Sequence, residues 1–172
     1  MSKNYIVIFF FFIVNLSLYA KEPTLAILRS VQTNEYQRLS IGMYEFICRP
    51  YGVITIDELY NKAEPNSECK QSIQSYYKKK PLEKYYSQSL LKIRQVYHIE
   101  FRQNMCLLYA NGKMSMSELL LKKGLALNIP NFADEEFKHS FENAQKYARS
   151  NKKGLFKENI EKKCIPYLNK KD

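Results

Sequence analysis

The order of apolar and polar positions predicts strands first and a helix after them in the first third of the chain. Residues 24–53 are rich in β-branched and aromatic side chains, with polar breaks at 32–35 and at Gly42, which is typical of a three-stranded meander. The sequence TIDE at 55–58 has the form of a capping box, because the threonine can accept from the backbone three residues on. A short helix is therefore predicted from there to Ala63.

Two longer helices and a hairpin are predicted next. Residues 68–80 and 81–94 both have helical periodicity, and Pro65 separates them from the preceding helix. Residues 96–101 alternate in polarity and precede a second apolar run at 106–110, so the two runs should pair as an antiparallel hairpin. The second helix has an apolar face that we expect in the core, formed by Leu82, Tyr86, Leu90 and Ile93.

The last third of the chain is predicted to be mainly helical. A helix over 116–123 should begin at Ser115 or Ser117 and end at Gly124, a favoured residue just after a helix. The longest helix is predicted over 134–150. This order of elements indicates an α+β fold. A small closed barrel with helices at one end suits it, because closure removes exposed sheet edges.

The first twenty residues have the features of a signal peptide. A lysine precedes an uninterrupted apolar run at 6–14, and Ala20 is a small residue suited to signal peptidase cleavage. Asn15 and Ser17 interrupt the run well before the ~20 apolar residues that a spanning helix needs. We expect an exported protein, periplasmic or secreted, with one domain at 21–172 and no stable membrane insertion after cleavage. An uncleaved anchor is the alternative.

Composition narrows the class of protein. Hydrophobic residues make up 45% of the 172 residues and charged residues 26%, which excludes disordered, collagenous and multi-pass membrane proteins. Lysine and arginine number 27 against 17 acidic residues, a formal net charge of +10. A surface of this charge attracts anionic partners such as phosphate, nucleic acid or lipid headgroups. Codon bias toward lysine contributes to such an excess in AT-rich genomes.

The four cysteines all lie in the expected exported part. An even number of cysteines in an oxidising compartment predicts two disulfides, and zinc binding is the competing interpretation. Zinc-ligand cysteines usually come in close pairs, whereas no CxxC occurs here, which favours disulfides. Three pairings remain open among Cys48, Cys69, Cys106 and Cys164.

Four motifs in the second half of the chain occur in a particular order and spacing. They are LLYANGK at 107–113, ELLLKKGLA at 118–126, AQKYA at 144–148 and GLF at 154–156. This series resembles the C-terminal half of the thermonuclease (staphylococcal nuclease-like) family. The resemblance covers about sixty residues well and residues 24–57 weakly. It implies a five-stranded OB-type β-barrel with about three main α-helices, and an activity against DNA or RNA.

The resemblance also assigns candidate catalytic residues. Phosphodiester hydrolysis needs a cation, a carboxylate that activates water and arginines that stabilise the transition state. The sequence RPYGVITID at 49–57 is similar to the family pattern RLYGIDAPE, which aligns Arg49 with a phosphate-binding arginine and Asp57 with the general-base glutamate. Ile54 stands where the family has a metal-binding aspartate, and that removes a hard oxygen ligand.

The remaining family positions are assigned with less support from the motifs. The family's DGDT turn corresponds to TNEY at 33–36, where Glu35 is the one candidate ligand for calcium, the family's cofactor. The second family arginine lies in a loop that is about nine residues shorter here, and this loop carries Arg102 instead, at a position that the family does not define. Purely structural roles compete for all four residues: a helix N-terminus for Asp57, a turn for Glu35 and solvated strand ends for Arg49 and Arg102.

Two functions follow as hypotheses. One is a metal-dependent nuclease, and the other is a module that binds DNA, RNA, another polyanion or a protein without hydrolysis; we expect a monomer in either case. The substituted Ile54 and the short arginine loop favour binding with weak or absent hydrolysis. Lys78 to Lys80, beside Tyr76 and Tyr77, fit either a phosphate and stacking patch or a solvated helix end.

Overall fold

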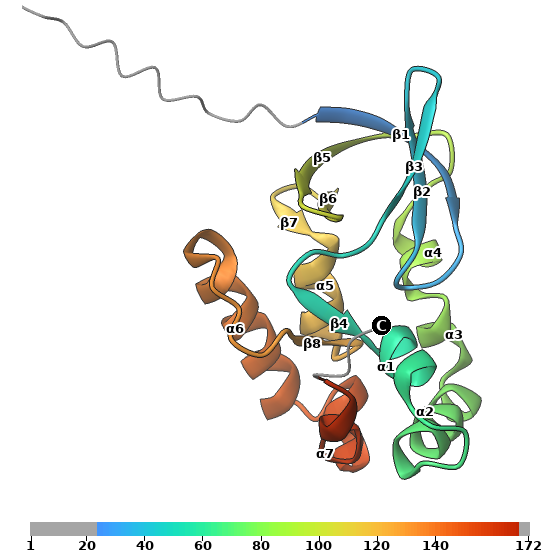
Figure 1. The fold of residues 1–172 in the computed structure, drawn as a ribbon, viewed down its shortest axis with the longest axis vertical. Coiled ribbons are helices and arrows are strands. Elements are labelled where there is room, and N and C mark those ends of the chain that lie inside the picture. The colour runs from blue at the N-terminus through green and yellow to red at the C-terminus, as the bar shows by residue number, and fades with distance from the viewer. Residues whose placement is uncertain (1–23, 169–172) are drawn as a thin grey trace, which may run out of the picture.

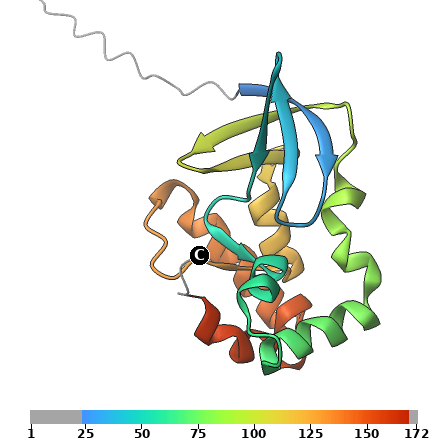
Figure 2. The same cartoon turned by 45° about the vertical axis from the view of Figure 1, so that its right-hand side comes forward.

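Six strands form a curled antiparallel sheet at one end of the molecule, and most of the helices lie at the other end (Figures 1 and 2). The computed structural model describes residues 24–168, so the predicted signal peptide lies outside the described residues. The sheet has the order β3-β2-β1-β5-β6-β7. Its strands are β1 (Thr24–Val31), β2 (Gln37–Ile41), β3 (Tyr44–Cys48), β5 (Val96–Arg102), β6 (Met105–Asn111) and β7 (Met114–Ser115).

The predicted meander and hairpin are confirmed by the strand pairing. Leu28 pairs with Leu39 and Leu39 with Phe46, so one face of β1, β2 and β3 points into the core. In the hairpin, Ile99 pairs with Leu108, and both side chains are buried. Alternation of buried and exposed positions along these strands is the period that a half-buried sheet requires.

The strands do not close into the expected barrel, because hydrogen bonding between strands is not continuous around the sheet. After β3 the chain meets β6 at one isolated bridge between Pro50 and Cys106, supported by hydrogen bonds from Tyr51 N to Cys106 O (3.2 Å) and from Cys106 N to Arg49 O (3.0 Å). Proline has no N–H to donate and is therefore confined to strand ends and edges. Pairing stops at this residue, and the described strands make an open, curled sheet.

A second, two-stranded sheet lies among the helices. It pairs β4 (Val53–Thr55) with β8 (Ala126–Asn128), and residues in this region were predicted as part of the meander or left unassigned. The helices are α1 (Ile56–Lys62), α2 (Glu68–Lys79), α3 (Pro81–Lys84), α4 (Tyr86–Leu90), α5 (Met116–Lys123), α6 (Glu135–Ser150) and α7 (Ile160–Cys164), with 3₁₀ turns at Gly154–Asn159 and Ile165–Tyr167. The described fold is α+β, as predicted.

Helix boundaries follow the local sequence signals in several places. Thr55 caps α1 by accepting from Glu58 N, and Ser115 caps α5 by accepting from Glu118 N. Gly124 follows α5 in the left-handed conformation, as predicted. These bonds satisfy backbone N–H groups that a helix start would otherwise leave without partners.

The single helix predicted over 81–94 is wrong. The chain breaks at Tyr85 into α3 and α4, and Leu82 and Ile93 of the predicted apolar face are exposed. The buried side chain of Asn34 explains the break. Its amide donates to the carbonyls of Glu83 and Lys84, and its carbonyl accepts from both N and Oγ of Ser87.

Two disulfides join elements that are distant in the sequence. Cys48 and Cys106 link the end of β3 to β6, and Cys69 and Cys164 link α2 to α7. The prediction of two disulfides is confirmed, and one of the three open pairings is selected. The zinc interpretation is wrong, since all four thiols are bonded in pairs. Within residues 24–168, no helix has the length and apolar character needed to cross a membrane.

Two glycines lie in direct backbone contact where α5 and α6 end. Gly124 and Gly154 have φ of +75° and +52°, and Leu155 N donates to Gly124 O at 2.8 Å. A Cβ at Gly154 would lie 2.0 Å from Gly124 O, closer than any real contact. The motif ELLLKKGLA at 118–126 and the motif GLF at 154–156 are therefore in contact in the structure.

Replacing Gly154 by alanine is expected to lower the free energy of unfolding by about 2–4 kcal/mol, because positive-φ strain and a backbone clash add together. Gly42 provides the matched control. It has φ +58°, but nothing lies within 4 Å of the point that an alanine methyl would occupy, so Gly42→Ala should cost about 1 kcal/mol. Urea unfolding followed by circular dichroism measures both. Equal losses in the two variants would contradict the proposed backbone contact.

Candidate functional site

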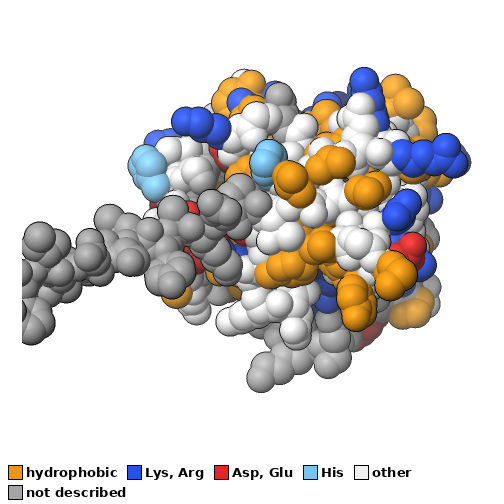
Figure 3. Space-filling model, turned by 90° about the horizontal axis from the view of Figure 1, so that it is seen from above, with side chains coloured by type: hydrophobic (Ala, Val, Ile, Leu, Met, Phe, Trp, Pro, Cys, Tyr) orange, Lys and Arg blue, Asp and Glu red, His pale blue; other side chains and the backbone are white. Residues whose placement is uncertain are grey.

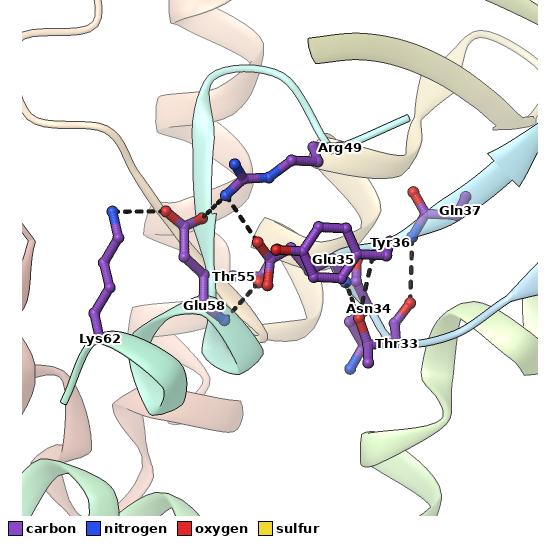
Figure 4. A network of polar contacts seen from close by, with 9 residues as sticks. All are labelled: Thr33, Asn34, Glu35, Tyr36, Gln37, Arg49, Thr55, Glu58 and Lys62. Carbon is purple, nitrogen blue, oxygen red and sulfur yellow. Dashed lines mark hydrogen bonds and ion pairs between the residues drawn. The ribbon is translucent and has the colours of Figure 1, made fainter. Parts of the chain in front are cut away.

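Arg49 lies at the centre of a polar network between the β1–β2 turn and the start of α1 (Figure 4). One of its guanidinium nitrogens is 2.8 Å from Glu35 Oε1 and 3.5 Å from Glu58 Oε2. The ring of Tyr36 lies 5.6 Å from the guanidinium carbon. The position of Arg49 follows from the bridge at Pro50, which holds the chain after β3 against β6. The structure therefore brings together Arg49 and Glu35, two of the candidate site residues, as partners in one ion pair.

Glu35 is a buried carboxylate, with a side chain only 2% exposed. The turn that carries it is organised by Thr33, whose hydroxyl accepts from the backbone N–H groups of Glu35 and Tyr36. Burial raises the pKa of Glu35, and a hydrogen bond from Tyr36 and the charge of Arg49 oppose that rise. Oε2 of Glu35 has no hydrogen-bond partner among the described residues. The hydrogen bond from Tyr36 and the ion pair with Arg49 therefore compensate together for this buried charge.

Glu58 is a member of the network that the sequence reasoning missed as a site residue. Its carboxylate contacts Arg49 and also lies 2.9 Å from Lys62 Nζ, one helical turn further along α1. The capping box identified Glu58 only as part of a helix start. Its spacing of four from Lys62 was a signal for an ion pair, but nothing local pointed to Arg49.

Asp57 lies next to this network and faces another direction. Its two carboxylate oxygens accept from Asn34 N at 2.9 Å and from the Tyr77 hydroxyl at 2.7 Å. Burial raises the pKa of Asp57, and these two hydrogen bonds oppose the rise. The residue lines a pocket of about 430 Å³ together with side chains of α1, α2 and α3. Asp57 therefore has the contacts of a structural acceptor between the β1–β2 turn and α2.

Arg102 belongs to a separate cluster at the β5–β6 turn. Its guanidinium is 2.8 Å from Glu100, 3.0 Å from Glu136 and 3.9 Å from Asp134, and it lies over the ring of Phe137. Three carboxylates surround one cation here. The structure thus gathers Glu35, Arg49 and Asp57 around one turn and places Arg102 among acidic partners of its own.

The residues present do not fit the calcium site that the family resemblance implies. Calcium takes six to eight oxygen ligands, several of them from carboxylates. Glu35 is instead held by Arg49, Ile54 is apolar and buried, and no group of three or more metal-ligand side chains occurs in the part of the chain that the structure describes. No chemical step through a metal ion therefore follows from this arrangement.

The charges of the network determine what it can do chemically. Glu35 and Glu58 face Arg49, and Lys62 adds a second cation through its contact with Glu58. A phosphate group at this position would meet carboxylates as well as the guanidinium, and like charges at short range repel. The network is suited to holding the β1–β2 turn against α1.

Two comparisons with known proteins give no match. No protein-family model matches the chain, and no curated protein is similar to it. The contacts of the described residues therefore carry the functional argument.

Proposed function

We propose that this chain is an exported, thermonuclease-like protein that binds nucleic acid and has little or no phosphodiester hydrolysis. The observation that carries the proposal is that Arg49 forms ion pairs with Glu35 and Glu58. These carboxylates neutralise the side chain that was expected to bind phosphate. The buried apolar side chain of Ile54 supports the same conclusion, because it stands where the family has a metal-binding carboxylate.

The strand order supports descent from an OB-type barrel. Five of the strands lie side by side in the order β3-β2-β1-β5-β6. The Cys48–Cys106 disulfide and the Pro50 bridge join β3 and β6, the two ends of this series. Five strands curled in this way are the basis of an OB fold, which binds oligonucleotides in many proteins. Because fold alone does not imply function, the binding proposal rests on charge as well. The net charge of +10 favours a polyanionic partner.

A binding and cleavage assay on the same samples tests this proposal. Full-length chain, purified from an oxidising compartment, is titrated into fluorescent single-stranded DNA and RNA at 50 and 200 mM salt, with calcium or with chelator. We expect binding that weakens at least about tenfold over this salt range, since phosphate contacts release counterions. We expect no cleavage products on denaturing gels under either condition.

Two outcomes would overturn the proposal. Absence of binding at 50 mM salt would exclude the nucleic-acid partner. Calcium-dependent cleavage that disappears in Asp57→Ala would establish the active nuclease instead. As a control, cleavage that persists both in this variant and in chelator would identify a contaminating enzyme, which is removed before the assay is repeated.

A protein partner is the second candidate function, favoured by exposed apolar side chains on the sheet. Met43 is 97% exposed and Tyr44 82% exposed at the β2–β3 turn, and Leu25, Ile47 and Val96 are at least half exposed. Figure 3 shows apolar side chains scattered over the face seen from above. Exposed apolar side chains mark an interaction site where they adjoin in one contiguous patch, and they are ordinary surface where they stand singly. A partner bound there would be held equally well at low and high salt.

A further inference from the structure

We propose that a single-stranded nucleic acid lies along a row of lysines and tyrosines on α2, α3, α4, α5 and the loop after α6, outside the Arg49 network. We call this row the Lys–Tyr track. The inference rests on the proposed function, because it names where on the molecule the nucleic acid binds. The track consists of Lys78, Lys84, Tyr85, Tyr86, Lys123 and Lys153.

Three pockets that share lining residues make the track continuous. The first pocket, of about 430 Å³, and the second, of about 550 Å³, share Tyr85. The second and a third pocket, of about 240 Å³, share Tyr86 and Lys123. Each pocket is open to solvent along part of its wall, and together they form a chain of hollows rather than one deep cavity. A flexible polymer suits such a surface better than one compact ligand.

The track contains two pairs of a lysine and an aromatic ring. Lys84 Nζ lies 5.9 Å from the ring centre of Tyr85, and Lys123 Nζ lies 5.6 Å from that of Tyr86. The Tyr85 side chain is 48% exposed, so a ring surface is open to a ligand. Proteins that bind single strands combine backbone-neutralising cations with aromatic rings on which bases stack. This combination of lysines with an exposed ring is the feature that favours a single strand over a duplex, whose bases are already stacked.

The third pocket has the strongest positive charge. Its described lining residues are Tyr86, Leu119, Lys122, Lys123 and Lys153, with no carboxylate among them. Lys153 donates a hydrogen bond to the hydroxyl of the nearby Tyr147 at 3.2 Å, and this bond, with the charges of Lys153 and Lys122, lowers the pKa of Tyr147. Lys123 also lies 3.6 Å from Glu83, which reduces its charge in part. A phosphate group in this pocket would meet three lysines, in contrast to the acidic surroundings of Arg49.

The tertiary structure holds the two track tyrosines in place. Tyr85 and Tyr86 stand at the break between α3 and α4, where Asn34 bonds to the backbone on both sides. Burial raises the pKa of Tyr86, so its ring stays neutral. A continuous helix over these residues would direct the two rings about 100° apart at one helical step. The break therefore sets how the rings line adjoining pockets.

The track is tested with a lysine triple variant and a matched control. The test variant is Lys84→Gln, Lys123→Gln and Lys153→Gln in the full-length chain. The control replaces three lysines elsewhere, Lys138, Lys157 and Lys162, and changes the net charge equally. The probe is a fluorescent fifteen-nucleotide oligothymidylate, measured by anisotropy from 25 to 200 mM salt, with circular dichroism to verify folding.

We expect the test variant to bind at least about tenfold more weakly at low salt and to lower the salt slope by about two, whereas the control should stay within about threefold of the original chain. Tyr85→Ala should weaken binding about five- to hundredfold if a base stacks there. Equal losses in the test and control variants, with the original chain still binding, would overturn the track and leave the proposed function standing.

Three other results would also overturn the inference. No binding by the original chain would remove the proposed function and the track together. Unchanged binding in Tyr85→Ala, with full competition by inorganic polyphosphate, would show a general polyanion site in place of a single-strand site. A duplex of the same length that binds as tightly as the single strand would contradict the stacking argument.

Discussion

Replacing Cys69 and Cys164 together by alanine is expected to lower the free energy of unfolding by about 3–5 kcal/mol. The disulfide closes a span of 95 residues, so its loss releases a large amount of chain entropy in the unfolded state. It also fixes α7 against α2, and both cysteines are fully buried. Because total stability of a domain is commonly 5–15 kcal/mol, this loss would leave the protein close to unfolding at 37 °C.

Urea unfolding followed by far-ultraviolet circular dichroism measures this effect, since the chain contains no tryptophan to serve as a fluorescent probe. The double variant of Cys48 and Cys106, whose disulfide spans 58 residues, should lose a similar amount, within about 1 kcal/mol. Thiol titration of the unfolded original chain should find no free cysteine. One or more free thiols in that chain, or a loss below about 1 kcal/mol in both variants, would contradict the structural role of the disulfides.

Replacing Arg49 by methionine is expected to cost about 3–5 kcal/mol at pH 7, because the substitution leaves the buried Glu35 carboxylate without its cation. Removing Arg49 takes away an influence that lowers the pKa of Glu35, so that pKa should rise further above its unfolded value. A carboxyl group with a raised folded pKa stabilises the folded state below its unfolded pKa and loses that contribution as pH rises. The cost of Arg49→Met should therefore shrink as pH falls from 7 toward 4.

Arg38→Met is the matched control for the Arg49 prediction. Arg38 pairs with Glu45 at 3.5 Å, but both side chains are about half exposed, so the substitution should cost under about 1 kcal/mol and show little dependence on pH. Adding Glu35→Gln to Arg49→Met should recover part of the loss, which a double-mutant cycle quantifies. Equal costs for the two arginine variants would show that the Arg49 pair is not a buried one.

Several elements were predictable because their signals are local. The Thr55 and Ser115 caps and the glycine after α5 each depend on groups no more than four residues apart, and the structure has all three. The three-stranded meander and the later hairpin were predictable from alternation, since side chains of a strand point to opposite faces in turn.

Other features depend on contacts between distant residues. Asn34 breaks the helix predicted over 81–94 from more than fifty positions away, and the periodicity of that segment contained no sign of it. Glu58 was recognisable as a cap residue but not as a partner of Arg49, and Arg102 gave no indication that it would meet Asp134. The pairing of four cysteines was undecided among three arrangements for the same reason.

The sequence by itself determined the class of fold, the number of disulfides and the ends of most helices, because these follow from spacing, parity and capping within a few residues. The tertiary structure alone decided which cysteines pair, which carboxylates surround each arginine and how Lys84, Tyr85, Tyr86 and Lys123 line adjoining pockets. The physical reason is that packing of the whole chain selects long-range contacts, and no single segment specifies them without the others.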